Sequence, residues 1–296
     1  MLPIPAFINP ESGNEGRSEG SAAGPGALIE QDVRFDSRRT EPERLADAVR
    51  AAVRAGAQRV LVAGGDGSIA SAASAIAGSG VELAVLPTGT LNHFAREHGI
   101  PLDVPAALDL AAEGAAIPTD VGYVNDRLFI NTSSVGAYVR FVKRRESLER
   151  RLGYRVASIL ASLRVFTASR PFRLELDVEG HRHLYRTTLV FIGVSERELR
   201  VPVLGGRVKD GQRGLHVMIP RASSHARLLV VAAKSALRGV QAAVGALELD
   251  SFVVESCRID LRHARDDISI DGEIAPFTTP LNYRVHRDAL RVVVDF

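Results

Sequence analysis

Two apolar runs that each end in a glycine-rich turn constrain this chain more than any other feature of its sequence. Val60–Ala63 leads into Gly64-Gly65-Asp66-Gly67-Ser68, and Ala84–Leu86 leads into Pro87-Thr88-Gly89-Thr90-Leu91-Asn92. Helix-like sequence follows each turn, a pattern typical of the strands of an α/β sheet. Ligands of such sheets bind outside the carboxyl ends of the strands. We therefore expect both turns to lie at one ligand-binding edge of a parallel sheet.

The residue types in these turns suit phosphate chemistry. Glycine lets the backbone approach a ligand closely and point successive N–H groups at an anion, and the helix starting near Ser68 adds its positive end. The carboxylate of Asp66 would repel a phosphate, so its presence beside these glycines suggests a bound cation or a role in proton transfer. Glycine-rich turns together with this carboxylate therefore predict phosphoryl transfer with a divalent metal. Taken alone, Gly-Gly-Asp-Gly is also a common tight turn. The chain has neither a P-loop with its lysine nor a Gly-x-Gly-x-x-Gly dinucleotide fingerprint.

Strands alternate with helices up to about residue 118, which predicts a parallel, doubly wound sheet. Besides the two apolar runs, we expect strands at Ile4–Ile8 and Leu28–Phe35. A helix is expected after Thr40, which we take as the N-cap, with Pro42 in the first turn. Further helices are expected at Ser68–Ile76 and Val104–Ala112.

From Thr119 onward the pattern becomes strand-rich, with helical stretches near 138–166 and 224–239. Arginines on one face of the first stretch suit either a solvated surface or contact with phosphates or an anionic membrane: Arg140, Arg144, Arg151 and Arg155. The expected strands are Val121–Val124, Arg127–Asn131, Phe172–Val178, Thr187–Val194, Gly214–Ile219, Cys257–Leu261, Asp267–Ile270, Leu281–Val285 and Leu290–Val294.

Bulk properties narrow the class of protein. A length of 296 residues suits two domains, and the net charge of +2 indicates no particular partner, nucleic acid included. The single cysteine, Cys257, excludes an internal disulfide and fits a reducing compartment. No apolar stretch approaches the roughly 20 residues of a membrane span, and the first residues show no secretory pattern. We expect a soluble, cytoplasmic protein.

Four motifs in this sequence together resemble a known family. Gly64-Gly65-Asp66-Gly67-Ser68 resembles the Gly-Gly-Asp-Gly-Thr signature of diacylglycerol, sphingosine and NAD kinases and of phosphofructokinases. Leu86–Arg96 is similar to the Pro-x-Gly-Thr-x-Asn-x-Phe-Ala motif of the lipid-kinase branch, which includes bacterial diacylglycerol kinases. Asn9-Pro10-Glu11-Ser12-Gly13 and Asp271-Gly272-Glu273 match the family's first and last motifs in the expected order.

The resemblance implies a two-domain architecture. It implies an N-terminal doubly wound parallel α/β domain, like that of NAD kinases and phosphofructokinases, and a C-terminal β-sandwich-like domain that binds the lipid. We place the first domain at residues 1–119 and 286–296 and the second at 120–285. The family's active site lies in the cleft between the domains.

The resemblance also implies a lipid kinase that uses ATP and Mg²⁺ and acts peripherally at the inner membrane face. Asp271 matches the family's proposed base for the acceptor hydroxyl, with Asp66 as the competing candidate; Ile270-Asp271-Gly272-Glu273 is equally an acceptable hairpin turn. The residues expected to bind the nucleotide are Asn9, Ser12, Gly64, Gly65, Gly67, Ser68, Gly89, Thr90, Asn92, Gly272 and Glu273.

The sequence departs from the family pattern at three places. Ser68 replaces the usual threonine, and Ser195-Glu196-Arg197 stands where relatives often carry an Asn-Asn pair, which affects the acceptor-lipid pocket. Lys209-Asp210-Gly211 begins a longer form of the family's acidic loop, so Asp210 is a candidate for a structural metal site.

Two other functions remain open from the sequence. The chain is alternatively a soluble-substrate kinase such as an NAD kinase, or a nucleotide- or lipid-binding regulator without catalysis. The identity of the acceptor lipid is not encoded in any motif. The oligomeric state is not readable from the sequence, although exposed strand edges in a β-rich domain often pair in homodimers.

Overall fold

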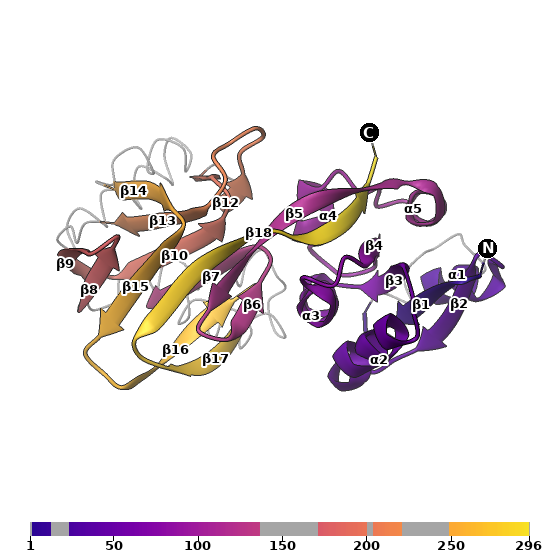
Figure 1. Cartoon of the computed structure of the whole chain (residues 1–296), viewed down its shortest axis with the longest axis horizontal. Helices are drawn as coiled ribbons and strands as arrows, with labels where there is room; N and C mark the ends of the chain where they lie inside the picture. The colour runs from indigo at the N-terminus through magenta and orange to yellow at the C-terminus, as the bar shows by residue number, and fades with distance from the viewer. Residues whose placement is uncertain (1, 13–23, 137–170, 200–203, 221–248, 296) are drawn as a thin grey trace, which may run out of the picture. The chain divides into compact units, whose positions relative to one another are not determined.

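The computed structural model describes residues 2–12, 24–136, 171–199, 204–220 and 249–295. The chain divides into two compact units, unit 1 (Met1–Val121 and His286–Phe296) and unit 2 (Gly122–Val285) (Figure 1). Two strands, β5 (Ala115–Val124) and β18 (Leu281–Val294), each begin in one unit and end in the other. Gly13 and the helical stretches expected near 138–166 and 224–239, with the arginine face of the first, lie outside the described residues.

Unit 1 is built on a parallel sheet with the strand order β2-β1-β3-β4-β18. Both faces of the central strands are covered, which explains why Val60–Ala63 is an unbroken buried run rather than an alternating one. The strands are β1 (Ile4–Ile8), β2 (Phe35–Arg39), β3 (Arg59–Gly64), β4 (Glu82–Pro87) and the last part of β18.

The helices of unit 1 lie on both faces of this sheet. The buried residues of α1 (Pro25–Gln31) and α5 (Val104–Glu113) share one core with alternate residues of β1, β3 and β4. α2 (Pro42–Arg54) and α3 (Asp66–Ile76) pack against each other. α2 also contacts β1, and α3 also contacts β3. The short helix α4 (His93–Glu97) follows β4. The doubly wound parallel domain expected from the sequence is confirmed.

Unit 2 is a β-sandwich. One sheet is antiparallel with the order β14-β13-β10-β7-β16-β17, and the second pairs the first part of β18 with β15, β8 and β9. One core joins the two sheets: Val135, Val190 and Ile192 come from the first, and Leu174, Leu176 and Ile259 from the second. The strands are β6 (Arg127–Phe129), β7 (Thr132–Gly136), β8 (Phe172–Val178), β9 (His181–Thr187), β10 (Leu189–Val194), β11 (Arg197–Leu199), β12 (Leu204–Arg207), β13 (Leu215–Pro220), β14 (Leu249–Val254), β15 (Ser256–Leu261), β16 (Arg265–Ile270) and β17 (Glu273–Thr278).

The strand expected at Leu28–Phe35 is wrong. Residues 25–31 form α1, and β2 begins only at Phe35. Pro25 occupies the first turn of α1 and Ile29 is fully buried on its inner side, so the short apolar pair Leu28–Ile29 belongs to a helix. β2 is an edge strand with polar residues after Phe35, and its sequence therefore lacks an apolar pattern.

The helix starts also differ from expectation by one or two residues. Glu41, not Thr40, is the N-cap of α2, and its side chain makes no capping hydrogen bond, because Pro42 at the first helical position already fixes the backbone. The Thr40 hydroxyl instead donates to the carbonyl oxygen of Arg38. α3 begins at Asp66 rather than Ser68, so Asp66 lies within the first turn of that helix.

Two strands expected near the C-terminus, Leu281–Val285 and Leu290–Val294, are one continuous strand, β18. The intervening residues are polar and exposed where the strand passes from unit 2 to unit 1, which hides the strand from pattern analysis. The Asp288 N–H donates to Oδ1 of Asp120 at this crossing. Six strands of unit 2 were not expected: β7, β9, β11, β12, β14 and β17. Most of β9 is polar, and β17 contains Pro276 on a sheet edge.

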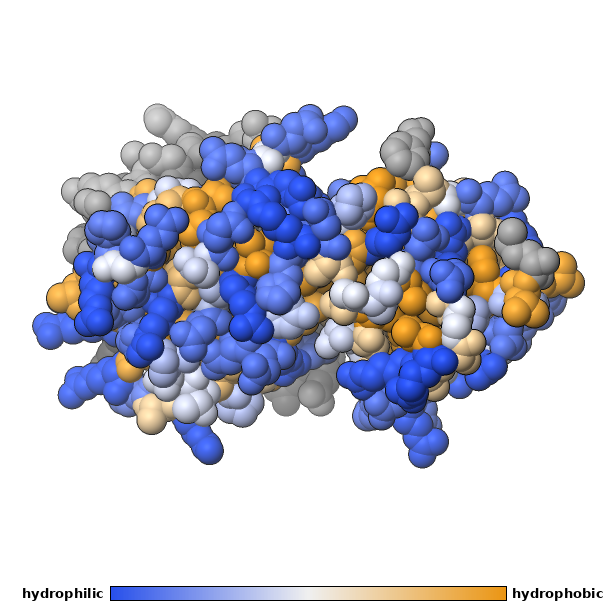
Figure 2. All heavy atoms as spheres, viewed as in Figure 1, coloured by the Kyte–Doolittle hydropathy of each residue, from blue (hydrophilic) through white to orange (hydrophobic). Residues whose placement is uncertain are grey.

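Among the described residues, no helix combines the length and apolar character needed to cross a membrane. Figure 2 shows hydrophilic residues over most of the visible face of unit 2.

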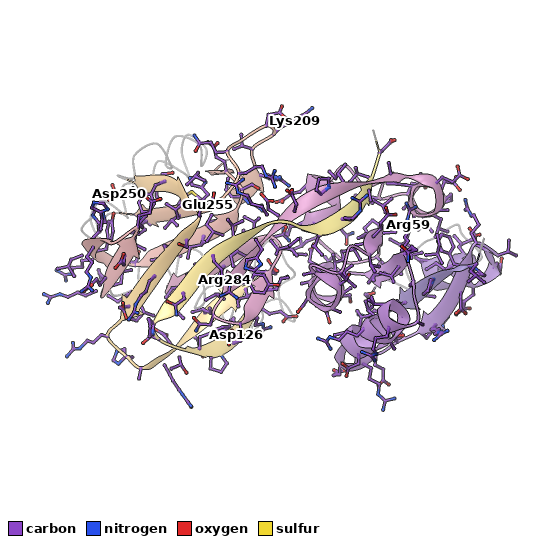
Figure 3. The ribbon with its side chains drawn as sticks, viewed as in Figure 1. Arg59, Asp126, Lys209, Asp250, Glu255 and Arg284 are labelled. Carbon is purple, nitrogen blue, oxygen red and sulfur yellow. The ribbon has the colours of Figure 1, made fainter. Side chains whose placement is uncertain are left out.

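Arg59 on β3 connects the C-terminal end of α5 to the sheet of unit 1 (Figure 3). Its guanidinium lies 2.7 Å from Glu82 Oε2 and donates to the carbonyl oxygens of Ala111, Ala112 and Gly114 at the end of α5. We expect Arg59→Met to lower the free energy of unfolding by about 2–3 kcal/mol, because it leaves three carbonyls without their side-chain donor and a mostly buried carboxylate with only the longer contact to Arg291, at 3.4 Å. Chemical denaturation measures this loss.

The matched control is Arg50→Met on α2, whose ion pair with Asp47 has the same 2.7 Å separation but is exposed. That substitution is expected to change the free energy of unfolding by less than about 0.5 kcal/mol. Equal losses from the two variants would contradict this account of Arg59.

Candidate active site

Three loops of unit 1 leave adjacent parallel strands at the same edge of the sheet. Asn9–Ser12 follows β1, Gly65 follows β3, and Thr88–Asn92 follows β4. The chain runs outward from β1 to β2 on one side and continues at β3 on the other, so the strand order reverses between β1 and β3. Ligands of open α/β sheets bind at the carboxyl ends of the strands at such a reversal. The structure therefore brings together the three motifs of unit 1 singled out from the sequence.

The two glycine-rich loops touch through their backbones. A Cβ atom placed on Gly89 would lie 2.5 Å from the Cα of Gly65, and one placed on Gly65 would lie 3.3 Å from the Cα of Gly89. A Cβ on Gly64 would lie 2.4 Å from the Cβ of Ser68. Glycine is required at these positions by the close packing of the loops, whatever ligand they bind.

Side-chain hydrogen bonds join the first loop to the other two. Asn9 Nδ2 donates to Ser68 Oγ at 2.8 Å, and Asn9 Oδ1 accepts from the Glu11 N–H at 2.9 Å. The Ser12 hydroxyl donates to the Asn9 carbonyl oxygen and lies 3.1 Å from Thr88 Oγ1. Asn9 and Ser68 are buried, so this part of the predicted nucleotide-binding set holds the loops together.

Asn92 plays a similar internal role. It takes a left-handed conformation with φ of 51°, its Nδ2 donates to the Gly89 carbonyl oxygen, and its Oδ1 accepts from the Gly89 N–H. The amide therefore closes the turn of its own loop. Gly67 and Thr90 are exposed, and among the described residues the Thr90 hydroxyl has no hydrogen-bond partner. These two are the predicted residues of unit 1 most available to a ligand.

Asp66 caps the helix that follows the next loop. Its carboxylate accepts hydrogen bonds from the backbone N–H groups of His93 (3.1 Å) and Phe94 (2.9 Å), the first two residues of α4. Two N–H donors and the positive end of a helix thus stabilise this carboxylate without a metal ion. Sequence analysis missed this role, because the two partners are separated by 27 residues and the pairing depends on how β3 and β4 align.

In unit 2, Asp271 lies in the turn between β16 and β17. Asp271 and Gly272 have φ of 48° and 89°, so the residues form a tight hairpin turn. The carboxylate accepts three backbone N–H groups: Oδ1 from Asn131 (2.8 Å) and Thr132 (2.9 Å), and Oδ2 from Ile130 (2.9 Å). Asp271 thereby ties this turn to the start of β7.

Burial raises the pKa of Asp271 to about 6, against the opposing effects of the three N–H donors and the charge of Arg197. An ionised carboxylate offers about four acceptor positions, and three of them are occupied here. The open position is on Oδ2, which accepts only one of the three hydrogen bonds. A proton acceptor with a pKa near 6 is largely ionised at neutral pH and suited to general-base work.

The other predicted residues of unit 2 are less enclosed. Glu273 is exposed and lies 3.1 Å from the guanidinium of Arg127. Asp210 is exposed in a turn with φ of 61°. The described part of the chain contains no group of three or more histidine, cysteine or carboxylate side chains placed to hold a metal. The metal site at Asp210 stays a prediction.

The segment that differs from the family's Asn-Asn pair is rigidly held. Arg197 is buried; its backbone N–H donates to Nδ1 of His216, and its Nε donates to the Val194 carbonyl oxygen. Burial lowers the pKa of His216, which is therefore neutral, and its Nε2–H donates to Ser251 Oγ at 2.6 Å. Sequence analysis singled out Ser195-Glu196-Arg197 but not His216, which lies 19 residues away on β13, a strand of another sheet.

Comparison with known proteins settles the family. The profile of the diacylglycerol kinase catalytic domain matches residues 3–124, which include all three loops of unit 1. A protein of Pseudomonas putida named "Probable lipid kinase YegS-like" is 32% identical over 253 residues, covering 82% of this chain and 78% of that protein. The chain belongs to the diacylglycerol kinase family. For three further relatives, the match spans only 29%, 51% and 31% of their own length.

Solved structures agree on the fold of this family member. A diacylglycerol kinase from Bacillus anthracis has a TM-score of 0.65 at 16% identity, covering 99% of this chain and 97% of that chain. Yeast NADH kinase complexed with NADH has a TM-score of 0.54 at 9% identity, covering 100% and 84%. These likenesses concern the fold alone, and they confirm the fold class expected from the sequence.

The cap that Asp66 provides can be tested in the ligand-free protein. We expect Asp66→Asn to lower the free energy of unfolding by about 1–2 kcal/mol, because the amide nitrogen would face a backbone N–H of α4. Hydrogen exchange at the Phe94 amide should accelerate. Asp47→Asn on α2 is the control, since Asp47 is exposed; unchanged Phe94 exchange in Asp66→Asn would overturn the cap.

The contact between the two glycine-rich loops predicts graded effects. Gly89→Ala is expected to lower the free energy of unfolding by about 1–3 kcal/mol, since its Cβ would overlap Gly65 and the loops must separate. Gly65→Ala should have a smaller effect, because its Cβ would meet Gly89 at a longer distance. Chemical denaturation of both variants checks the order, and the reverse order would contradict the contact.

Proposed function

We propose that this protein is an ATP-dependent lipid kinase that transfers the γ-phosphate of ATP to a hydroxyl of diacylglycerol or a related lipid. The observation that carries the proposal is the set of three interlocked loops at the carboxyl ends of β1, β3 and β4 in a member of the diacylglycerol kinase family. The relatives named lipid kinase and diacylglycerol kinase support this acceptor class. We place the reaction at the inner membrane face, with the enzyme bound peripherally from the cytoplasm.

The three loops suit the phosphates of a nucleotide. Because glycine has no side chain, the backbone of the β3–α3 turn and of the loop after β4 is open to a phosphate. The first N–H groups of α3 are proposed to point toward that phosphate. Gly67 and Thr90 are exposed beside these glycines and supply an N–H and a hydroxyl. Asn9, Ser12, Ser68 and Asn92 act in this proposal by fixing the shape of the loops.

One carboxylate of unit 1, Asp66, is available to a Mg²⁺ ion that accompanies the nucleotide. Each Asp66 oxygen accepts one N–H, which leaves acceptor capacity on both. Mg²⁺ is usually bound by one or two carboxylates together with substrate phosphates, so a single carboxylate fits this role. When bound, Mg²⁺ neutralises the charge that develops on the phosphates.

Asp271 acts in this proposal as the base that accepts the proton of the lipid hydroxyl. Its Oδ2 has the open acceptor position, and three N–H groups hold the carboxylate in one orientation. Holding the base in place is worth more to phosphoryl transfer than raising its basicity, because positioning and charge stabilisation dominate that reaction. Gly272 and Glu273 lie in the same turn and are proposed to face the nucleotide.

The test is transfer of γ-labelled phosphate from ATP to mixed micelles of total lipid extract, followed by chromatography of the products. A labelled lipid is expected with the wild type. NAD is offered as acceptor in a parallel reaction, because labelling of NAD in place of lipid would support a soluble-substrate kinase. ATP binding without any labelled product would support a regulator and contradict the proposal.

The role of Asp271 predicts both a loss of activity and a pH profile. Asp271→Asn should reduce kcat by about 100-fold or more, the usual contribution of a general base. In the wild type, kcat/KM should rise with pH through about 6 and then level off, because the base works only when ionised and kcat/KM reports the pKa of the ligand-free enzyme. Steady-state kinetics between pH 5 and 8 measure the profile.

Asp266→Asn on β16, the strand before this turn, is the matched control, since within the described residues the Asp266 carboxylate accepts a hydrogen bond only from the N–H of Asp267. It should retain activity. A melting curve for each variant separates loss of activity from loss of fold. Full turnover by a folded Asp271→Asn protein would show that Asp271 is not the base and would leave Asp66 as the candidate.

A further inference from the structure

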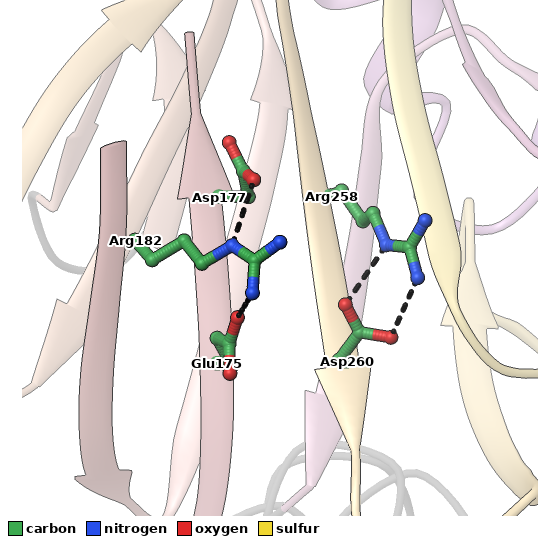
Figure 4. Close-up of a pocket in the computed structure, with 5 residues that line it drawn as sticks. All are labelled: Glu175, Asp177, Arg182, Arg258 and Asp260. Carbon is green, nitrogen blue, oxygen red and sulfur yellow. Dashed lines mark hydrogen bonds and ion pairs between the residues drawn. The ribbon is translucent and has the colours of Figure 1, made fainter. Parts of the chain in front are cut away.

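The outer face of the sheet β18-β15-β8-β9 in unit 2 carries rows of charged side chains set by the strand register. In one row, Arg182 on β9 faces Asp177 on β8, which faces Arg258 on β15. Arg182 contacts both Glu175 and Asp177, and Arg258 contacts Asp260 at 2.8 Å (Figure 4). Each arginine in this part of the face therefore has a carboxylate partner.

At the other end of the same face the register places arginine opposite arginine. Arg173 on β8 pairs directly with Arg186 on β9. Both side chains are exposed, and the described residues provide neither of them with an ion pair or hydrogen bond. Leu174 and Leu176 belong to the core, so the alternating Arg173 stands on the outer side of the sheet together with Glu175.

Two more residues extend this arginine pair. Arg262 follows directly after β15, whose last residue, Leu261, pairs with Leu174; it is exposed and likewise has no partner among the described residues. Leu184 lies between Arg182 and Arg186 on the edge strand β9 and is 84% exposed. We call Arg173, Arg186, Arg262 and Leu184 the arginine patch.

Like charges directly opposite each other destabilise a sheet. The adjacent rows show that carboxylates fit on this face, yet within the described residues no carboxylate stands directly opposite Arg173 or Arg186. A partner that brings negative charge removes the repulsion. Guanidinium groups bind phosphate with paired hydrogen bonds, and an exposed leucine among basic residues inserts readily between lipid headgroups.

We propose that the arginine patch docks the protein on the anionic headgroups of a lipid bilayer. This rests on the proposed function, since a kinase whose acceptor is a membrane lipid must work at such a surface. Anionic bilayers attract basic residues within about one Debye length of the surface, so the docking should weaken with added salt.

The test measures binding of the full chain to vesicles, without nucleotide. Sedimentation compares vesicles of phosphatidylcholine alone with vesicles that also contain phosphatidylserine. The wild type is expected to bind only the second, and Arg173→Gln/Arg186→Gln should bind about 30-fold more weakly, at about fivefold per arginine. Leu184→Ser should weaken binding without changing its salt dependence.

Arg44→Gln/Arg54→Gln on α2 is the matched control. Both arginines are exposed and have no ion pair among the described residues, so the net charge changes equally while the patch stays intact. This control should bind like the wild type. Equal weakening by both double variants would show that net charge alone drives binding and would overturn the patch.

Other results overturn the proposal in distinct ways. Vesicle binding that persists in the patch variant together with new self-association would show that the arginines protect the β9 edge from pairing with another chain. Absence of vesicle binding by the wild type would also contradict the patch. Phosphate transfer to a water-soluble short-chain diacylglycerol tests the proposed function separately, and the patch variant should keep its kcat in that assay.

Discussion

The contact between Gly65 and Gly89 determines the geometry of the candidate active site. It joins the loops after β3 and β4 through bare backbone, at a separation that no side chain can enter. The parallel register of β3 and β4 sets the two loops side by side, and Asp66 reinforces the contact by holding the first N–H groups of α4. A phosphate-binding surface made of backbone needs this kind of support, because backbone N–H groups bind an anion well only when they are held in place.

Most polar side chains of the site bind to one another. Asn9 bonds to Ser68, Ser12 to Thr88, and Asn92 to Gly89, so these side chains shape the loops that present Gly67 and Thr90. Asp271 follows the same rule in unit 2, where three backbone donors fix its carboxylate and leave one acceptor position open. Many residues of each motif thus hold the loops in shape and leave only a few, such as Gly67 and Thr90, exposed at the surface.

The sequence predicted the main architecture because it depends on local patterns. The unbroken apolar runs at β3 and β4 exist because both faces of the sheet are covered, and the glycine-rich turns mark where the strands end. Elements with weak patterns were missed: α1 resembles a strand in its two apolar residues, and β18 is polar where it leaves one unit for the other. Hydrophobic patterns in a sequence reveal elements that bury apolar side chains over several turns or residues. These two segments were missed because the first is short and the second is exposed.

Roles that depend on partners distant in the sequence could not be predicted. From the sequence, the carboxylate of Asp66 is expected to repel a phosphate and has no evident partner. In the fold it accepts hydrogen bonds from the first N–H groups of α4. The opposition of Arg173 and Arg186 follows from strand register, and the hydrogen bond from Arg197 to His216 joins strands of two different sheets. Motif matching named the residues of the site, whereas only the structure separates those that hold the loops from those left exposed.

The central claim is that the three interlocked loops of unit 1 bind the phosphates of ATP. The most direct test is nuclear magnetic resonance of the ¹⁵N-labelled protein during titration with ATP and Mg²⁺. We expect the largest shift changes at the amides of Gly65, Gly67, Gly89 and Thr90, with little change at β9 or α2. Largest changes elsewhere in the chain, or saturation by ATP without change at these four amides, would contradict the account.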